Sequence, residues 1–325
     1  MKKMLCIAVL MLTALISGCS GQEQSETAFA AKVGILLSDT GLGDGSFNDG
    51  AFEGLVRARD ELNILFDYRE APEGNYEEHL QELSAQDYDL IIGLGFSVQE
   101  ALEQTAADFP DQQYVLIDGV SEADNIISMT FKDHEGSYLI GTLAALTSES
   151  GVIGFIGGVE APTIERFEAG FRAGAEMANP DIQIISDYAG DFGDADLGRT
   201  IASRQIEQGA DFIYPAAGYT GTGAILEAQE NGIYTAGVDT DQFYTAEQSV
   251  VTSMVKNINT SVFNMVQELT EEKLSADLYN LGLAEDGVGL AEIRLIQLDA
   301  TGQALMMDTR KKIISGEIDV PETVQ

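Results

Sequence analysis

The chain of 325 residues has no tryptophan, only two histidines and two cysteines, and few basic residues. The histidines, His79 and His134, lie in acidic stretches typical of helices, and no Cys–His spacing predicts a zinc site, so we expect two surface histidines. A Gly-x-Ser-x-Gly turn, which a serine hydrolase of the α/β type needs, is missing. With 17 basic against 54 acidic residues, the formal charge of -37 would repel a phosphate backbone. We therefore expect no nucleic-acid partner, no metal and no catalytic residues.

Two further patterns in the sequence could indicate an enzyme. The glycine-rich stretch 151–158 lacks the Gly-Lys-Ser/Thr ending of a phosphate-binding loop and predicts a strand and turn. The acids Asp39, Asp44 and Asp49 could hold Ca²⁺ in a nucleoside hydrolase, but their spacing is not that of an EF-hand. We expect no cofactor. The strong acidity fits either salty or alkaline surroundings or a solvated coat without further meaning.

Long apolar runs are also scarce, and the only one lies at the start. Two lysines precede an apolar run over 4–16, and small residues follow it, which predicts a secretory signal over 1–18 that is too short to span a bilayer. Residues 16–19, Ile-Ser-Gly-Cys, resemble the bacterial lipobox, which implies lipidation of Cys19 and a lipid anchor on the extracytoplasmic face of the cell membrane. The alternative is plain secretion with Cys19 as a free thiol. Cys6 would leave with the signal, so no intramolecular disulfide is expected, and 19–31 is predicted to be a flexible tether.

The remaining chain, about 295 residues, is more than one hydrophobic core usually serves, so we expect two lobes. Short apolar runs alternate with longer amphipathic stretches, which is typical of an α/β fold. The first half predicts strands at 33–37, 64–68, 90–92, 114–117 and 126–131 with helices at 48–62, 76–84 and 98–109. The second predicts strands at 152–156, 182–186, 212–216 and 234–238 with helices at 163–179, 197–208 and 221–231. Small and apolar residues form one stripe on helix 163–179, which we expect to lie on a sheet. Two such halves predict a ligand cleft between them.

The loop 38–50 follows a predicted buried strand and precedes a predicted helix. In open α/β sheets ligands bind at this position, where free backbone N–H groups and the helix dipole point into the crevice. Its four glycines allow close approach, and Asp39, Asp44, Phe47 and Asn48 offer acceptors, a ring and an amide. The alternative is an ordinary glycine-rich connection whose Asp and Asn residues only cap the helix.

Several motifs in order resemble those of the basic membrane protein family, lipoprotein receptors of ABC importers, several of which bind purine nucleosides. The motifs are Asp-x-Gly-x-x-Asp-Gly-Ser-Phe-Asn at 39–48, Phe-Ile-Gly-Gly-Val-Glu-Ala-Pro at 155–162, Gly-Thr-Gly at 221–223, Gly-Val-Asp-Thr-Asp-Gln at 237–242, Thr-Ser at 252–253 and Lys-Asn at 256–257. The resemblance covers nearly the whole mature chain.

The resemblance implies a type I periplasmic-binding-protein fold, with two Rossmann-like lobes joined by three crossover strands. We expect the crossings near Phe131, Ser253 and Ala284, with helix 258–274 returning to the first lobe. The N-terminal lobe would then comprise 32–131 and 254–284, and the C-terminal lobe 132–253 and 285–325. The implied partners are a purine nucleoside and an ABC permease, and we expect a monomer.

The resemblance also implies roles for individual residues. Phe47 and Tyr214 would stack on the base from opposite lobes, with Phe96 and Phe192 as aromatic alternatives to Tyr214. Asn48 and Asp39 would read the base edge. The ribose would meet Asp118, Asp239, Lys256 and the helix that begins at Gly221.

These assignments leave alternatives open. Tyr214 could belong to the core, and Asp118 and Asp239 could only cap turns. A membrane-attached regulator of the same superfamily, which senses a ligand and signals, or a receptor for another small ligand would have similar lobes.

Overall fold

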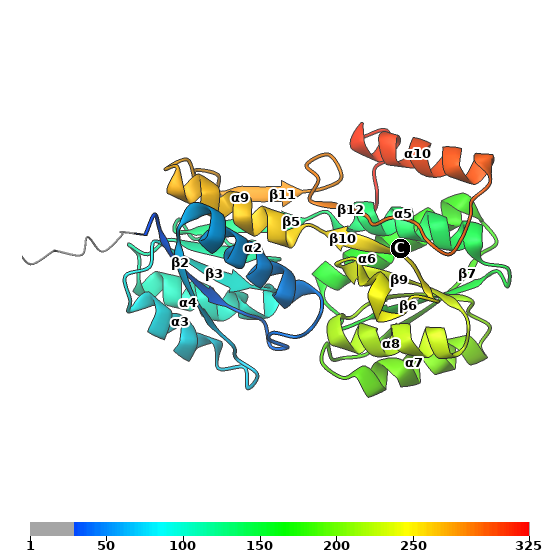
Figure 1. Cartoon of the computed structure of the whole chain (residues 1–325), viewed down its shortest axis with the longest axis horizontal. Coiled ribbons are helices and arrows are strands. Elements are labelled where there is room, and N and C mark those ends of the chain that lie inside the picture. The colour runs from blue at the N-terminus through cyan, green and yellow to red at the C-terminus, as the bar shows by residue number, and fades with distance from the viewer. Residues whose placement is uncertain (1–28, 325) are drawn as a thin grey trace, which may run out of the picture.

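The computed structural model describes residues 29–324, which form two α/β lobes side by side (Figure 1). The predicted signal 1–18, Cys19 and most of the predicted tether lie outside the described residues. None of the described helices is long and apolar enough to cross a membrane.

The first lobe is built on a six-stranded sheet in the order β11-β5-β4-β3-β1-β2, and all its strand pairs are parallel. Its strands are β1 (Lys32–Leu36), β2 (Leu65–Arg69), β3 (Leu90–Leu94), β4 (Tyr114–Ile117), β5 (Ile126–Phe131) and β11 (Leu278–Leu281). The central strands are buried on both faces, which explains their continuous apolar sequences. Helices α2 (Phe47–Leu62) and α9 (Ile258–Thr270) cover one face, and α3 (Tyr76–Ser84) and α4 (Gln99–Asp108) cover the other (Figure 1).

The second lobe repeats this order as β12-β10-β9-β8-β6-β7. Its strands are β6 (Val152–Gly157), β7 (Gln183–Tyr188), β8 (Phe212–Ala216), β9 (Tyr234–Asp239), β10 (Val250–Lys256) and β12 (Val288–Leu290), of which only β12 runs antiparallel to its neighbour. Helices α5 (Asp133–Thr147) and α6 (Pro162–Ala178) lie on one face, and α7 (Ala195–Glu207) and α8 (Gly218–Glu230) lie on the other (Figure 1). The two lobes therefore present equivalent strand ends to each other.

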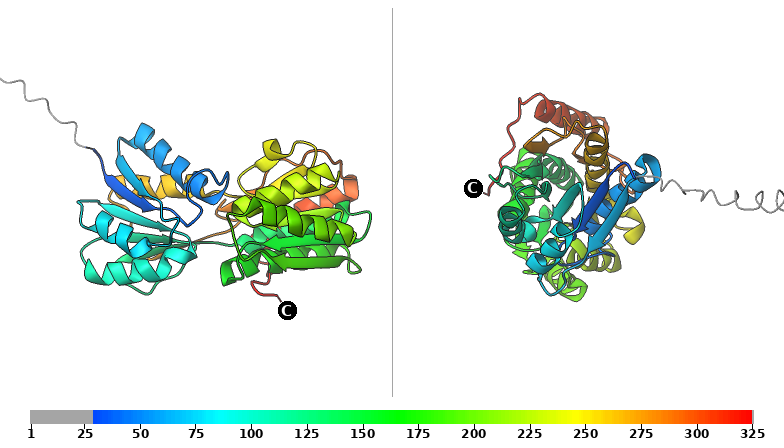
Figure 2. Two further views of the ribbon diagram at one scale, coloured as in Figure 1. Left: turned by 90° about the horizontal axis from the view of Figure 1, so that it is seen from below. Right: turned by 90° about the vertical axis from the view of Figure 1, so that its left-hand side faces the viewer.

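Three segments of the chain connect the lobes, as the left-hand view of Figure 2 makes visible. They join β5 to α5, β10 to α9 and β11 to β12. The second crossing lies a few residues beyond the expected Ser253, because Met254–Lys256 still pair with β9 or β12. Lys256 is thus the last residue of the second lobe's sheet before the chain returns.

Helix α5 is absent from the sequence-based prediction, and its surroundings explain why. Twelve of its fifteen residues are buried, so no polar stripe gives it the helical period. It packs against α6 at very short range: a Cβ on Gly141 would lie 1.9 Å from the carbonyl oxygen of Phe171, and one on Gly174 2.0 Å from that of Tyr138. The small-residue stripe of α6 thus faces a second helix, and the expectation that the whole stripe lies on a sheet was wrong.

The C-terminal helix α10 (Ala300–Ile314) is the other long helix missing from the prediction. It packs on the outside of α5, and its residues Met306 and Ile313 are buried there (Figure 1). The short strands β11 and β12 were also missing, because three or four half-exposed residues have no clear alternation.

The close contact of α5 and α6 predicts a strong effect of one added methyl group. We expect Gly141→Ala to lower the free energy of unfolding by about 1–3 kcal/mol, because the methyl group would force the two backbones apart. The control is Gly289→Ala, where a Cβ would meet nothing within 4 Å. Urea unfolding of both variants provides the measurement, and equal stability of the two would contradict this packing argument.

Candidate functional site

A cavity of about 280 Å³ lies between the lobes at the carboxyl ends of the strands. The first lobe lines it with the loops after β1, β3 and β4. The second lobe contributes the ends of β8, β9 and β10, the loops after β6 and β7, and the first turns of α6. Of the residues expected in the site, Asp39, Phe47, Asp118, Asp239 and Lys256 line this cavity. Enclosed spaces of this kind between domains are preferred ligand sites.

The side chain of Lys256 is the central charge of this region and is only 2% exposed. Its Nζ lies 2.5 Å from Oδ2 of Asp118 in the first lobe and 3.3 Å from Oδ1 of Asp133 at the start of α5. The ring centroids of Phe131, Phe47 and Phe167 lie 4.9, 5.2 and 5.7 Å from the same nitrogen. Two carboxylates and three rings thus replace the water that the ammonium loses.

Burial changes the proton affinities of this cluster. Burial alone would lower the pKa of Lys256, but Asp118, Asp133 and Asp239 outweigh it and raise that pKa, so the lysine stays charged. Burial raises the pKa of Asp133 to about 7 despite the attraction of Lys256, and Asp118 and Asp239 add to the rise. Burial likewise raises the pKa of Asp239 to about 6. The cluster therefore has more carboxylates than its single cation can hold ionised.

Asp118 and Asp239 occupy equivalent places in the two lobes, at the ends of β4 and β9. Both have left-handed backbone conformations, with φ of 62° and 63°. Aspartate tolerates this conformation better than most residues, and such strained positions cluster at functional sites. Their carboxylates enter the cavity from opposite lobes.

The loop after β1 also contacts the second lobe directly. The hydroxyl of Ser46 donates to Oδ2 of Asp239 at 2.5 Å, and the hydroxyl of Thr240 donates to the carbonyl oxygen of Gly45 at 2.9 Å. Because these contacts join the two lobes across the cleft, the described conformation is a closed one.

Aromatic rings line the rest of the cavity. Phe96 follows β3 in the first lobe and Phe192 follows β7 in the second, and their ring centroids lie 6.4 Å apart across the cleft. Gly158 makes room for the second ring, because a Cβ there would lie 2.1 Å from it. Phe167 on α6 and Phe47 on α2 complete the aromatic set. The sequence analysis missed Phe167, although its place one turn into the helix after β6 was a usable signal.

The expectation that Tyr214 stacks on a ligand was wrong for this conformation. Its side chain is fully buried in β8, where the ring packs against Phe155 and Phe171. Its hydroxyl lies 3.1 Å from that of Ser137 on α5, and burial raises the pKa of the tyrosine. Tyr214 belongs to the core, and the second lobe brings Phe167 and Phe192 to the cavity instead.

Asn48 does not face the cavity either, contrary to the role expected for it. Its amide oxygen accepts from the backbone N–H of Ser38 at 3.0 Å, and its amide nitrogen donates to Thr40 and Asp44 at 3.0 and 2.9 Å. All of its hydrogen-bonding groups are thus used to tie the loop to the helix, which leaves none for a base edge.

Gly221 lies inside α8, which begins three residues earlier at Gly218, and it does not line the cavity. Gly218 does, with a φ of 55° that favours glycine. The expected role of a helix start is therefore taken by Gly218.

The acids of the glycine-rich loop divide into two groups. Asp44 accepts from the backbone N–H groups of Ser46 and Asn48, both at 2.9 Å, and Asp49 accepts from those of Gly43 and Gly45. These carboxylates shape the loop, as the capping alternative predicts. Asp39, in contrast, is exposed at the mouth of the cavity, and its carboxylate accepts no hydrogen bond from residues 29–324. It remains available to a ligand.

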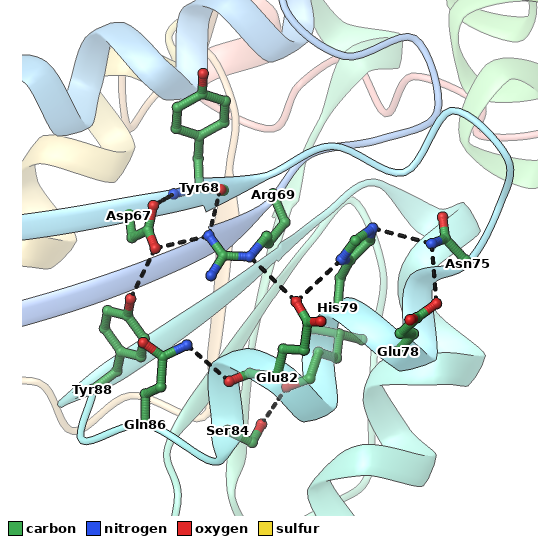
Figure 3. Close-up of polar contacts among 11 residues, drawn as sticks. Asp67, Tyr68, Arg69, Asn75, Glu78, His79, Glu82, Ser84, Gln86 and Tyr88 are labelled. Atoms are coloured by element: carbon green, nitrogen blue, oxygen red, sulfur yellow. Dashed lines mark hydrogen bonds and ion pairs between the residues drawn. The ribbon is translucent and has the colours of Figure 1, made fainter.

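The two histidines lie outside the cavity. His79 belongs to a polar network between β2 and α3, where Nε2 lies 3.1 Å from Asn75 and Nδ1 lies 3.6 Å from Glu82 (Figure 3). His134 is only 7% exposed, so the expectation that it is a surface residue was wrong, and burial lowers its pKa. Within the described part of the chain, no group of three or more His, Cys, Asp or Glu residues has the arrangement of a metal site.

A two-lobed α/β chain that closes on an aromatic and acidic cavity has the architecture of a solute-binding protein. Residues 31–324 match the family described as ABC transporter substrate-binding protein PnrA-like (Bmp), and the chain belongs to this family. As the sequence predicts, the family consists of binding proteins rather than enzymes, and its members work with a membrane permease.

Similar proteins agree with this assignment. Basic membrane protein A of Borreliella burgdorferi is 34% identical over 330 residues, which cover 99% of this chain and 96% of that protein. The ABC transporter nucleoside-binding protein BmpA of Lactococcus lactis is 31% identical over 352 residues, which cover 98% and 99%. The crystal structure of ABC transporter system solute-binding proteins from Aeropyrum pernix K1 has a TM-score of 0.84 at 27% identity and covers 91% of this chain and 94% of that one. The predicted fold class and family are confirmed.

Replacing the central lysine tests the electrostatics of the cluster. We expect Lys256→Met to lower the free energy of unfolding by about 3–5 kcal/mol, because two buried carboxylates lose their cation. The loss should be larger at pH 8 than at pH 5. Burial raises the pKa of Asp133 to about 7 even beside the cation, and the stability linked to a carboxyl with a raised pKa in the folded state is lost as the pH rises.

Urea unfolding at both pH values measures this effect. The control is Lys273→Met, because Lys273 is 69% exposed and its loss should change stability by less than about 0.5 kcal/mol. If the free energy of unfolding of Lys256→Met is lowered by the same amount at both pH values, the electrostatic explanation is contradicted.

Proposed function

We propose that this substrate-binding protein takes up a purine nucleoside in the cleft between its lobes and delivers it to its ABC permease. The observation that carries the proposal is the division of the cavity lining into two chemistries. Phenylalanine rings from both lobes suit a flat base, and carboxylates beside one ammonium suit a polyhydroxylated sugar. The cavity of about 280 Å³ is close to the lower end of the range for small-molecule sites, about 300–1,000 Å³.

The base is assigned to the aromatic part of the cavity. Phe47 reaches it from the first lobe and Phe192 from the second, so that closure of the lobes would bring both rings to the same ligand. Stacking on an aromatic side chain contributes about 1–3 kcal/mol per base and tolerates different bases. Preference for a purine then requires a hydrogen-bonding group, and the unpartnered carboxylate of Asp39 can accept from a ring or exocyclic N–H.

The ribose is assigned to the charged part of the cavity. Asp118 and Asp239 are acceptors when ionised, and vicinal hydroxyl groups are donors, so the two match. Lys256 can donate to a sugar oxygen while it keeps its contact with Asp118. A nucleotide is disfavoured, because its phosphate would meet four carboxylates that line the cavity, those of Asp39, Asp44, Asp118 and Asp239, and only one ammonium.

The name of the Lactococcus lactis relative, a nucleoside-binding protein of an ABC transporter, supports the same cargo. A monomer suffices for this site, because one chain supplies both walls of the cavity.

We further propose that Cys19 carries the lipid that holds the protein on the extracytoplasmic face of the membrane. We expect Cys19→Ser to move the protein from the membrane fraction to the soluble fraction, measured by fractionation and immunoblotting. Retention of the variant in the membrane fraction would contradict the anchor.

The cargo is tested by calorimetry of protein from residue 20 onward, refolded to remove carried-over ligand. The panel contains inosine, guanosine, adenosine, cytidine, free purine bases, ribose and AMP. We expect binding of purine nucleosides and no heat from AMP or ribose. Binding of cytidine alone would leave the role in transport unchanged but make the ligand a pyrimidine nucleoside. If none of these compounds binds, the nucleoside proposal is overturned.

Two variants assign the aromatic contact within the same experiment. Phe192→Ala should weaken every bound nucleoside by about 1–3 kcal/mol, equivalent to about five-fold to more than a hundred-fold in affinity. The matched control is Tyr214→Phe, which removes a hydroxyl from the core and leaves the cavity lining intact. Wild-type affinity in Phe192→Ala would contradict the stacking role proposed for Phe192.

A further inference from the structure

Asp133 is an ionisable residue beside the cavity to which the proposed function gives no role. It is the first residue of α5, is 1% exposed, and follows the first crossing between the lobes. It does not line the cavity, so it would not touch a ligand there. Its connection to the site runs through Lys256, whose Nζ lies 3.3 Å from its Oδ1.

The groups that face Asp133 come from four strands of the two sheets. They are Lys256 on β10, Asp118 after β4, Asp239 at the end of β9 and Tyr214 on β8. The neighbouring residues of its own helix belong to another cluster. The charged groups that act on His134, the next residue, are Glu322, Glu135, Arg166 and Lys132. Asp133 thus has one cation within reach, and two other carboxylates compete for it.

Asp118 lies closer to the ammonium of Lys256 than Asp133 does. The Lys256 nitrogen is 2.5 Å from Asp118 but 3.3 Å from Asp133. Apart from this ion contact, neither carboxylate oxygen of Asp133 has a hydrogen-bond partner among residues 29–324. A buried carboxylate with so little compensation is costly to keep ionised.

We propose that Asp133 is a positioning residue that binds a proton when a nucleoside fills the cleft, so that ligand binding is linked to proton uptake. The inference rests on the proposed function, because the hydroxyl groups of a bound ribose would donate to Asp118 and Asp239 and keep both ionised. A neutral Asp133 then leaves the ammonium of Lys256 to Asp118 and to the sugar. No covalent step is involved.

The pH range of this linkage follows from the same contacts. The N-terminus of α5 favours an ionised Asp133, but burial, Asp118 and Asp239 outweigh it and raise the pKa of this carboxyl to about 7 before any ligand binds. Ligand binding excludes water and fixes the two neighbouring anions, so it moves this pKa further up. Because binding then takes up a proton, nucleoside affinity falls as the pH rises above about 7, by up to about tenfold per pH unit.

The first measurement needs no ligand. Carbon-13 spectra of protein labelled on aspartate carboxyl groups should contain one resonance that titrates near pH 7 and is missing from Asp133→Asn. If no aspartate of the wild-type protein titrates between about pH 6 and pH 8, the proposal is overturned, even if the variant fails to fold.

The second measurement is calorimetry with inosine, whose base stays neutral near pH 7. Wild-type protein should take up protons on binding at pH 7.5, seen as a difference in heat between phosphate and Tris buffers. The matched control His134→Gln should keep this uptake and the fall of affinity with pH, because His134 faces the other cluster. Asp133→Asn should lose both, and an unchanged pH profile in this variant would overturn the proposal.

The two measurements separate this inference from the proposed function. Inosine binding without proton uptake would leave the function standing and overturn the linkage. If wild-type protein binds neither inosine nor any other purine nucleoside, the function and the linkage both fall, and the carbon-13 spectrum still decides whether Asp133 holds a proton in the ligand-free protein.

Discussion

The buried ammonium of Lys256 is the interaction on which the geometry of the cleft depends. It sits on the last residue of β10, so it belongs to the second lobe, yet its shortest ion pair is with Asp118 of the first lobe. Asp133, its other partner, begins the helix that follows the first crossing. One charge thus joins two of the three crossings and both lobes. A buried pair of this kind is weak evidence for stability, but removal of one partner is expensive, which makes it well suited to fixing a geometry.

Repetition of the α/β unit explains why the site has matching halves. The strand orders of the two lobes correspond one to one, so β4 and β9 end opposite each other across the cleft. Asp118 directly follows β4 and Asp239 is the last residue of β9, and both have left-handed backbone conformations. The same local strain in both lobes, at the point where a ligand would lie, is better explained by a binding requirement than by the needs of either sheet alone.

The sequence predicted the strands and helices with a clear period and the residues at strand ends. Asp118, Asp239 and Lys256 were assigned through the resemblance to the basic membrane protein family, and all three line the cavity at strand ends, where open α/β sheets place their ligands. The sequence could not predict whether a polar side chain already has hydrogen-bond partners within the protein. The amide group of Asn48 has all its hydrogen bonds to its own loop. Nor could the sequence orient Tyr214, two residues before the end of β8, where one face of the strand leads to the core. Helix α5 was not predicted, because it is buried on nearly all sides and therefore has no polar stripe by which a helix can be identified in a sequence.

The glycine-rich loop combines two tasks that first seemed to be alternatives. Asp44 and Asp49 hold its backbone in place, as a helix-capping role requires. The shape they impose carries Ser46 across the cleft to Asp239, a carboxylate that also lines the cavity. Opening the lobes would take this donor away and leave a strained aspartate facing water. The carboxylate of Asp239 therefore serves both closure of the lobes and contact with a ligand. A group that binds Asp239 from within the cavity acts on the equilibrium between open and closed lobes, as Ser46 of the loop does.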